Sequence, residues 1–339
     1  MVDVGIIGAS GYTGAELLRL LAGHPEAHVR FATGDTQAGT PVRDLYPGLA
    51  AAYPDLVFLP WEPTLLDGVD AVFLGLPHGA SQGLVPELLG RVDVVLDLGA
   101  DFRLPDAATY ERWYGGTHSA PELLGRFAYG LPELAREPLR GAGAVAVPGC
   151  YPTAATLALW PLVRDGLVAR EGVIVDAVSG LSGAGRPPKP TTTFCAADSD
   201  VTAYGLLDHR HTSEMELNLG ASVLFTPHLV PMSRGILATC YARPTAEGLS
   251  TERVLDALRD AYRDEPFVVV TDGSPSTKAT LGSNTAHVTA RYDARTGTVL
   301  AIAAIDNLGK GASGAAVQCM NLATGLPETA GLPLVGTTP

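Results

Sequence analysis

Lysine, cysteine and aromatic residues are scarce in this chain of 339 residues. Three of its 23 basic residues are lysines, aromatic residues make up 6% of the chain, and the formal net charge is -13. Because a nucleic-acid binder neutralises phosphates with basic side chains, this acidic balance argues against a nucleic-acid partner. The four cysteines, at positions 150, 195, 240 and 319, are far apart and form no Cys-x-x-Cys pair, so neither a zinc knuckle nor a dense disulfide scaffold is indicated.

Long apolar runs and targeting signals are also missing. No run of about 18 apolar residues could span a bilayer, and the first residues lead into a predicted strand without a basic segment or a small-residue cleavage site. Hydrophobic residues nevertheless make up 46% of the chain against 17% charged residues, which is enough to bury large cores. The length favours two domains. We therefore expect a globular cytoplasmic protein without a membrane partner.

The first half of the chain alternates between β-like and helix-like stretches. The β-prone runs are at residues 2–7, 28–33, 71–76 and 92–98, and the helix-like stretches are at 15–21 and 81–89. This alternation predicts an α/β fold with a doubly wound parallel sheet of the Rossmann type.

The second half has a different sequence pattern, in which one predicted helix is followed by longer β-prone runs. The helix is predicted over 153–165, and the β-prone runs are at 173–178, 222–226, 235–242, 267–270, 286–292 and 299–305. Runs 236–242 and 298–306 are expected to pair in a mostly antiparallel sheet, which makes this an α+β domain. Segment 183–193, rich in Gly, Pro and Thr, is expected to be a loop that can move, and 312–322 returns to helix.

A glycine-rich turn follows the first predicted strand, in the pattern Gly-x-x-Gly-x-x-Gly from Gly8 to Gly14. Glycines permit a tight turn and close backbone approach, and the N-terminus of the next helix offers N–H groups to a pyrophosphate. The turn predicts a dinucleotide site, although a strand–helix turn without a ligand has the same pattern. The residues expected to contact the cofactor there are Gly8, Ser10, Gly11, Tyr12, Thr13 and Gly14.

The choice between NAD and NADP depends on the end of the second predicted strand. Asp35 lies 21 positions after Gly14, near where an acidic residue would hold a ribose 2'-hydroxyl and repel a 2'-phosphate. Thr33 and Thr36 could equally donate hydrogen bonds to a phosphate. Both cofactors remain open on these residues.

A cysteine at the start of a predicted helix is the most informative feature, in the run Pro148-Gly149-Cys150-Tyr151-Pro152-Thr153. Proline suits a first helical turn. A thiol at a helix N-terminus has a stabilised thiolate, so its pKa falls from about 8.5 towards neutrality. Cys150 is therefore a nucleophile candidate, and the same N–H groups could receive an oxyanion. The other three cysteines are expected to be small buried hydrophobic residues.

An acid/base partner for this thiol is available in the second half. His209 and His211 open a predicted helix, and Glu214 follows His211 by three positions, where it could orient the imidazole or complete the helix cap. A His-x-His pair can bind zinc, but no third ligand stands nearby, so no metal is expected.

Three further segments combine glycine with a cation and could hold an anion. They are 97–103, 179–186 and 306–314. Inward-facing N–H groups backed by arginine form a phosphate-binding nest, whereas a plain loop with a solvated arginine gives the same pattern.

Taken together, these motifs resemble the N-acetyl-gamma-glutamyl-phosphate reductase family of semialdehyde dehydrogenases, over nearly the whole chain. The resemblance rests on segments 8–14, 75–79, 97–103, 128–133, 148–153, 179–186, 209–214 and 306–321. It implies a glyceraldehyde-phosphate-dehydrogenase-like architecture. Residues 1–148 and 313–339 would form the NADP-binding Rossmann domain, and residues 149–312 the catalytic, substrate-binding and oligomerisation domain.

The resemblance also implies roles for individual residues. Cys150 would be the nucleophile, His211 or His209 the acid/base, and NADP the cofactor, with Thr33, Pro77 and Asn307 as further contacts. The residues expected to bind the substrate are Arg103, Arg186 and Lys189 at its phosphate, Arg234 at its carboxylate, and Ser182 and Glu214. Many relatives carry Ser and Arg where this chain has Gly34 and Asp35, so NAD stays possible.

The implied reaction is NADPH-dependent reductive dephosphorylation of N-acetyl-L-glutamyl 5-phosphate to the semialdehyde in arginine biosynthesis, through a thioester on Cys150. Three alternatives are kept: the paralogous reductase of a carrier-bound aminoadipyl phosphate in lysine biosynthesis, a reductase of aspartyl phosphate, and a non-catalytic dinucleotide sensor. A homo-oligomer, dimer or tetramer, is expected, with the second domain's sheet as the interface.

Overall fold

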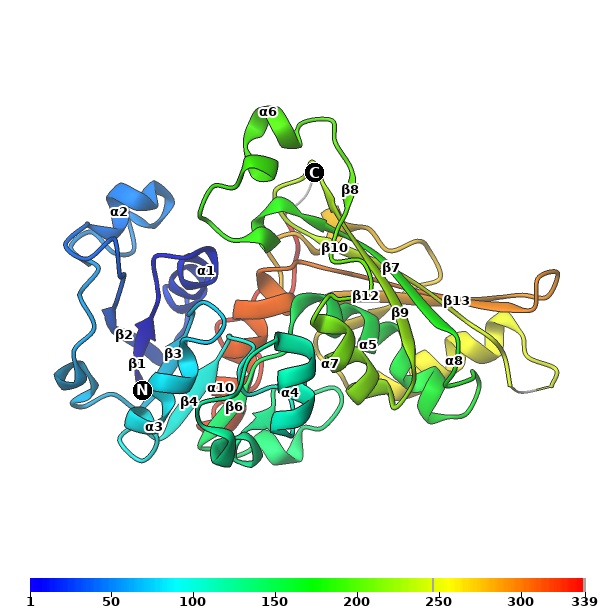
Figure 1. Ribbon diagram of the computed structural model, residues 1–339, viewed down its shortest axis with the longest axis horizontal. Helices are drawn as coiled ribbons and strands as arrows, with labels where there is room; N and C mark the ends of the chain where they lie inside the picture. The colour runs from blue at the N-terminus through cyan, green and yellow to red at the C-terminus, as the bar shows by residue number, and fades with distance from the viewer. Residues whose placement is uncertain (246, 338–339) are drawn as a thin grey trace. The chain divides into compact units, whose positions relative to one another are not determined.

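The computed structural model describes residues 1–245 and 247–337, in two compact units. The first unit comprises Met1–Pro148 and Ala312–Leu332, and the second comprises Gly149–Gly311 and the segment from Pro333 onward. Figure 1 shows both, with a sheet in each.

A six-stranded parallel sheet forms the centre of the first unit, in the order β2-β1-β3-β4-β6-β5. Its strands are β1 (Val2–Ile7), β2 (Ala27–Ala32), β3 (Ala71–Leu74), β4 (Val94–Asp97), β5 (Ala128–Tyr129) and β6 (Ala144–Ala146). Every residue of β3 and β4 is buried, as expected for parallel strands covered on both faces. The predicted doubly wound α/β sheet is confirmed.

The helices of the first unit are α1 (Tyr12–Leu21), α2 (Val42–Leu45), α3 (Ser81–Leu88), α4 (Ala107–Tyr114) and α10 (Gly314–Ala323). Helix α1 buries Leu17, Leu18, Leu20 and Leu21, the pattern of a helix with one face on a sheet. Helix α10 contacts α1 and β4, and every residue from its start to Leu322 is buried. The chain therefore returns to the first unit as a core helix.

The sheet of the second unit has seven strands in the order β11-β12-β13-β10-β7-β9-β8. They are β7 (Val173–Gly180), β8 (Thr202–Ala203), β9 (Val223–Val230), β10 (Ile236–Ala242), β11 (Val268–Val270), β12 (Ala286–Asp293) and β13 (Thr298–Ile305). The predicted pairing of β10 with β13 is confirmed as antiparallel, with Ile236 opposite Ile305. The pairs β7–β9 and β11–β12 are parallel, so the sheet is mixed.

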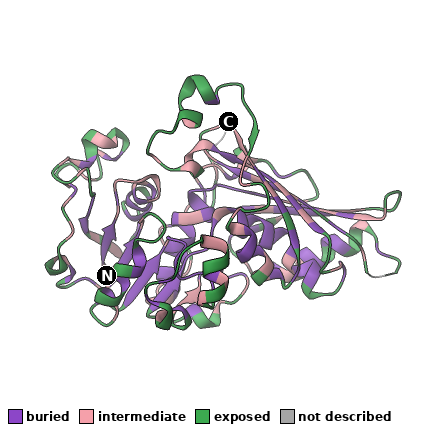
Figure 2. Ribbon diagram, in the orientation of Figure 1, coloured by how far each residue is buried: buried purple, intermediate pink, exposed green. Residues whose placement is uncertain are grey.

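Helices α5 (Cys150–Arg164), α7 (His211–Leu219) and α8 (Thr251–Ala261) cover one face of this sheet (Figure 1). Two single-turn helices, α6 (Phe194–Ala197) and α9 (Thr277–Thr280), lie in its connections. Figure 2 shows α5 almost wholly buried, whereas the segment around α6 is exposed. The expected loop 183–193 overlaps one short 3-10 turn, Leu181–Ala184, and contains another, Pro190–Thr192.

Residues 333–337 belong to the second unit, whereas the sequence-based division assigned the whole of 313–339 to the first. The Asn284 N–H donates to the Pro333 carbonyl at 2.8 Å, and the Thr337 N–H donates to the Leu281 carbonyl at 2.7 Å. These backbone bonds fix residues 333–337 to the second unit. Among the helices of residues 1–245 and 247–337, none has the length and apolar character needed to cross a bilayer.

Candidate active site

The glycine-rich turn after β1 uses its three glycines in different ways. Gly8 has φ +83°, and a Cβ there would lie 2.6 Å from the Gly75 carbonyl oxygen. A Cβ on Gly14 would lie 2.3 Å from the Ala9 Cα, whereas one on Gly11 would meet nothing closer than 3.7 Å. Gly8 and Gly14 are therefore required for backbone geometry and packing, while Gly11 leaves open backbone that a ligand can approach.

Helix α1 begins directly after this open glycine. Its N-cap is Gly11, in extended conformation (φ -81°, ψ 172°), with no side chain capping the helix and no acidic residue in the first turn. Ser10, Tyr12 and Thr13 are half-buried beside it. The first-turn N–H groups and the positive end of the helix dipole suit a pyrophosphate, so the residues present fit a dinucleotide.

Thr33, expected as a cofactor contact, is buried beneath the turn. Its Oγ1 accepts a hydrogen bond from the Gly8 N–H at 3.1 Å, and its carbonyl accepts from the Ala9 N–H at 2.7 Å. Thr33 thus holds the end of β2 against the glycine turn. Asp35 follows in an exposed turn.

A buried acid cluster anchors the loop after β3 that carries Pro77. The Asp101 carboxylate lies 2.9 Å from His78 Nδ1 and 2.7 Å from Ser81 Oγ, which is also 3.0 Å from Asp97 Oδ2. Complete burial raises the pKa of Asp97 to about 6. Pro77 itself is exposed. The sequence singled out segments 75–79 and 97–103, but no pattern indicated that their side chains meet.

Cys150 is the first residue of α5 in the second unit. Gly149 is the N-cap (φ -69°, ψ 150°), and no side chain caps this helix either. The first intrahelical bond is donated by the Thr153 N–H to the Gly149 carbonyl at 3.0 Å, and Pro152 has no N–H. Cys150 is half-buried and forms no disulfide. A Cβ on Gly311 would lie 2.9 Å from the Cys150 Cβ, so backbone packs directly against the cysteine.

Helix α7 presents His211 and Glu214 to the start of α5. A Cβ on Gly149 would lie 2.6 Å from His211 Nε2 and 2.9 Å from Glu214 Oε1. Glu214 has no exposed surface, and its Oε2 accepts a hydrogen bond from the Gly149 N–H at 3.0 Å. The structure thus brings Cys150, His211 and Glu214 together around Gly149.

His209 lies just before α7, among aromatic rings. Its Nδ1 accepts a hydrogen bond from the His211 N–H at 3.2 Å, and its ring centroid is 4.9 Å from that of His211 and 5.2 Å from that of Phe225. Burial, helped by the positive charge of Arg210, lowers the pKa of His209 to about 4. His209 is therefore neutral at physiological pH.

Two tyrosines line the same region, and the sequence did not point to them. Tyr151 donates to the His228 carbonyl at 3.3 Å, and Tyr204 donates to the Tyr151 hydroxyl at 3.1 Å. Burial raises the pKa of Tyr151 beyond its usual range and that of Tyr204 to about 12. Both stay protonated. Tyr204 comes from the connection after β8, which no local pattern links to α5.

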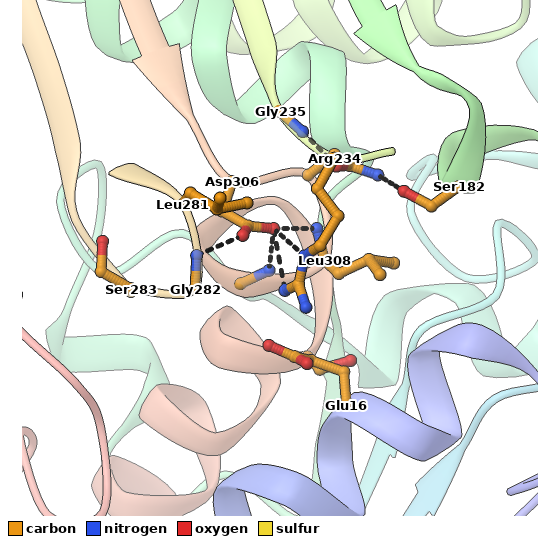
Figure 3. Close-up of polar contacts among 12 residues, drawn as sticks. Glu16, Ser182, Arg234, Gly235, Leu281, Gly282, Ser283, Asp306 and Leu308 are labelled. Carbon is orange, nitrogen blue, oxygen red and sulfur yellow. Dashed lines mark hydrogen bonds and ion pairs between the residues drawn. The ribbon is translucent and has the colours of Figure 1, made fainter. Parts of the chain in front are cut away.

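The turns 181–186 and 231–235 meet at one end of the sheet, shown in Figure 3. The N–H groups of Leu181 and Ser182 donate to the carbonyls of Met232 and Ser233. The side chain of Asn307 joins the two turns, donating to Ser182 Oγ at 2.9 Å and accepting from the Gly235 N–H at 2.7 Å. Asn307, expected at the cofactor, has both ends of its amide used within the second unit.

The basic residues expected at the substrate have different environments. Arg186 is half-buried, and its Nε is buried without a hydrogen-bond partner among the residues described. Lys189 is exposed. Arg234 pairs with Asp306 at 3.0 Å. Arg103 is in the first unit, where it donates to the Leu98 carbonyl at 2.9 Å. Within the described part of the chain, no cluster of three or more His, Cys, Asp or Glu side chains is arranged to hold a metal ion.

Comparisons with known proteins agree with the fold of the two units. The semialdehyde dehydrogenase NAD-binding domain family matches residues 3–142, and the semialdehyde dehydrogenase dimerisation domain family matches residues 150–307. Among solved structures, aspartate semialdehyde dehydrogenase II of Vibrio cholerae, complexed with ASA, has a TM-score of 0.71 at 18% identity, covering 96% of this chain and 98% of that one. The enzyme of Candida albicans, solved with NADP, has a TM-score of 0.68 at 15% identity, covering 96% and 99%.

Curated relatives are much more similar in sequence. The N-acetyl-gamma-glutamyl-phosphate reductase of Magnetococcus marinus is 48% identical, over 97% of this chain and 96% of the relative. That of Symbiobacterium thermophilum is 49% identical, over 98% and 97%. The suspected resemblance is therefore confirmed, and the chain belongs to the N-acetyl-gamma-glutamyl-phosphate reductase family of semialdehyde dehydrogenases.

Proposed function

We propose that this protein reduces N-acetyl-L-glutamyl 5-phosphate to N-acetyl-L-glutamate 5-semialdehyde with NADPH, in the cytoplasm, as a step of arginine biosynthesis. The observation that carries the proposal is the position of Cys150 at the first residue of α5, next to a glycine that lies against His211. A dinucleotide sensor has no use for this pairing. Family membership narrows the acyl phosphate to the one in the relatives' names.

The nucleophile in this proposal is the Cys150 thiolate. His211 takes the thiol proton, and Sγ attacks the acyl carbonyl carbon, forming a C–S bond and an oxyanion. The N-terminal turn of α5, whose first intrahelical bond is donated by the Thr153 N–H, is placed to receive that charge through the positive end of the helix dipole. As the carbonyl re-forms, the bond to the phosphate oxygen breaks, His211 returns its proton to the leaving phosphate, and a thioester remains.

When bound, a nicotinamide dinucleotide would supply the hydride needed to reduce the thioester carbonyl. His211, protonated again from solvent, then protonates the sulfur as the C–S bond breaks and the aldehyde leaves. His209 is better suited to holding His211, because its Nδ1 already accepts the His211 N–H and its pKa is about 4. Glu214 accepts a hydrogen bond from the Gly149 N–H. It therefore also fits a positioning role better than direct substrate binding.

Anion recognition falls to the loops around Cys150. Arg186, with its buried Nε lacking a partner among the described residues, is suited to the substrate phosphate, assisted by Lys189 of the same segment. Arg103, which belongs to the first unit, is kept as a further candidate for that phosphate from the family resemblance. Arg234, with Ser182 beside it, is assigned to the substrate carboxylate. Asn307 is assigned to holding Ser182 in place.

NADP is proposed as the cofactor, held at Gly11 and the first turn of α1, with Pro77 lining the neighbouring loop. Family membership supports the choice, while Asp35 in its exposed turn would favour NAD if its carboxylate met the ribose. Replacing Asp35 by Ser tests this directly: if the carboxylate opposes a 2'-phosphate, the Kd for NADP falls and that for NAD rises.

The deciding experiment is the reverse reaction. The protein is incubated with N-acetylglutamate semialdehyde and inorganic phosphate, NADP or NAD is supplied separately, and absorbance of the reduced cofactor is followed. Phosphate-dependent reduction of NADP supports the proposal. Absence of reduction with either cofactor, in protein that binds a dinucleotide, contradicts it. The carrier-bound aminoadipyl semialdehyde is then the next substrate to assay, followed by the sensor alternative.

We further propose a homo-oligomer assembled through the uncovered face of the second unit's sheet. The side chains that alternate away from the helices include Ile174, Leu224 and Tyr241, and Leu224 is 49% exposed. With Thr298 they line a hollow of about 550 Å³. An apolar sheet face of this kind marks a protein interface, and a second copy is the partner that the name of the matched dimerisation family suggests.

Sedimentation of wild type and of Leu224→Lys tests this assembly. The lysine places a charge in the proposed interface, so the variant should sediment as a monomer at concentrations where the wild type does not. Leu206→Lys is the control, because Leu206 is exposed elsewhere, in the connection between β8 and α7. A monomeric wild type, or an L224K variant that assembles normally, would refute the interface.

A further inference from the structure

The buried carboxylate of Asp306, directly after β13, forms hydrogen bonds or an ion pair with three separate segments of the second unit (Figure 3). Its Oδ2 accepts from the Gly282 N–H at 2.6 Å, and its Oδ1 accepts from the N–H groups of Leu308 at 2.9 Å and Gly309 at 3.0 Å. Asp306 has no exposed surface. Because water cannot reach it, the carboxylate depends on these donors and on its ion pair.

The ion pair fixes Arg234 in an unusual way. Both Nε at 3.1 Å and Nη2 at 3.0 Å donate to the same oxygen, Oδ1. A guanidinium held through two nitrogens on one edge has its plane and its direction set together. With 21% of its side chain exposed, Arg234 is a partly accessible cation whose orientation is dictated from the buried side.

The backbone of Arg234 is held just as closely. A Cβ on Gly180, at the end of β7, would lie 2.7 Å from the Arg234 nitrogen and 2.9 Å from its Cα. The carbonyl of Asp306 also accepts from the Gly311 N–H at 2.9 Å, and Gly311 is the residue packed against Cys150. Asp306 therefore contacts both Gly311, which packs against Cys150, and Arg234.

We infer that Asp306 is a positioning residue that orients Arg234 towards the substrate carboxylate, and so sets affinity for the amino-acid end of the substrate. The inference rests on the proposed function, in which Arg234 binds that carboxylate. It predicts a selective effect: the carboxylate end of the substrate should be bound less well, while the phosphate and the dinucleotide are bound as before.

The reverse reaction separates these effects, because semialdehyde, phosphate and NADP each have their own KM. Asp306→Asn keeps the size of the side chain but removes the charge that aligns the guanidinium. We expect the KM for the semialdehyde to rise about 10-fold, with the KM values for phosphate and NADP unchanged. Arg234→Gln should raise the same KM by about 100-fold. In the double variant, D306N should add less than about 2-fold to R234Q, because its effect passes through Arg234.

Asp293→Asn is the matched control. Asp293 pairs with Arg295 at 3.4 Å in the turn joining β12 to β13, at the opposite end of β13 from Asp306. It should leave all three KM values unchanged. A general loss of packing in D306N would instead raise all three KM values, and its effect would add fully to that of R234Q. Either result, or an unchanged semialdehyde KM, would overturn the inference.

Should D306N fail to fold, Asp306→Glu keeps a charge for the buried N–H groups and displaces the oxygens by one methylene. The semialdehyde KM should still rise selectively, and an unchanged value would reject the positioning role. A wild-type protein that does not catalyse phosphate-dependent reduction would count against the proposed function instead. Asp306 would then be judged by the rate at which phenylglyoxal modifies Arg234, which should differ between wild type and D306N.

Discussion

Helices α1 and α5 start in the same way but present different chemistry. Each has a glycine N-cap in extended conformation, no capping side chain and no acidic residue in its first turn. At α1 the N-cap Gly11 is open, because a Cβ added there would meet nothing closer than 3.7 Å. At α5 the same place beside Gly149 is filled by His211 and Glu214.

The difference shows how one backbone device serves two purposes. A helix N-terminus with unpaired N–H groups favours negative charge. Where the approach is open, as at α1, that charge can come from a ligand. Where a cysteine is the first helical residue and a histidine closes the approach, as at α5, it can come from a thiolate and then from an oxyanion formed beside it.

The largest effect should come from removing the thiol. Cys150→Ser leaves the helix start intact but replaces the thiolate by a hydroxyl that stays protonated, so kcat in the reverse reaction should fall by roughly 10³-fold or more. Fluorescence titration should give an unchanged Kd for the dinucleotide. If C150S retains substantial reductase activity, the start of α5 does not supply the nucleophile, and the contrast with α1 is wrong.

Filling the place beside Gly149 should cost less but still lower kcat. In Gly149→Ala the new methyl would lie 2.6 Å from His211 Nε2, so the imidazole must move by an ångström or so, and kcat should drop by about 100-fold. Steady-state kinetics and circular dichroism provide the check. Normal kcat in a folded G149A protein would mean that His211 does not need its observed position.

The matching change at α1 should affect binding alone. In Gly11→Ala the new methyl would meet no protein atom closer than 3.7 Å, so the fold should persist, while the methyl occupies the approach to the first-turn N–H groups. We expect the Kd for the dinucleotide to rise about 10-fold, with kcat at saturating cofactor within about 2-fold of wild type. Equal affinity in G11A and wild type would place the cofactor elsewhere.

The smallest effect concerns pH and distinguishes the two histidines. The pKa of His209 is lowered to about 4 by burial and by Arg210, against about 6.5 in an unfolded chain. The unfolded state therefore binds the extra proton between these values. Stability falls as the pH drops from about 6.5 to 4, by roughly 3 kcal/mol at most.

Asn at position 209 can accept the His211 N–H but does not titrate. His209→Asn should therefore be less sensitive to acid than wild type, which urea unfolding at pH 5 and pH 8 can measure, and it should keep the pH–rate profile above pH 6. If kcat above pH 6 falls as far in H209N as in His211→Asn, His209 rather than His211 would be identified as the acid/base.

Patterns of local periodicity predicted much of the fold. The run at 2–7 matches β1, and the pairing of 236–242 with 298–306 matches β10 and β13. Helix α8 (Thr251–Ala261) was not predicted, although Ser250 caps it by accepting from the Arg253 N–H. Short strands such as β8 carry too few residues for a period to be recognised.

The site was less predictable, because its contacts are remote in sequence. The position of Cys150 at a helix start followed from the proline and glycine around it, and the histidine pair from its placement at a helix. Thr33, Glu214 and Asn307 have the chemistry of ligand contacts, yet the structure engages each in holding backbone or a neighbouring side chain. Asp306 collects donors from residues up to 72 positions away, which no local pattern reveals.

The space beside Gly149 also constrains how this chain can change over evolutionary time. Position 149 lacks a side chain because two residues of α7, more than 60 positions later, occupy its volume. A mutation that adds a Cβ there is tolerable only after His211 and Glu214 have become smaller, and those changes remove the imidazole that is proposed to carry the proton and the acceptor of the Gly149 N–H. Substitutions at positions 149, 211 and 214 therefore depend on one another, and we expect a change at one of them alone to impair the protein.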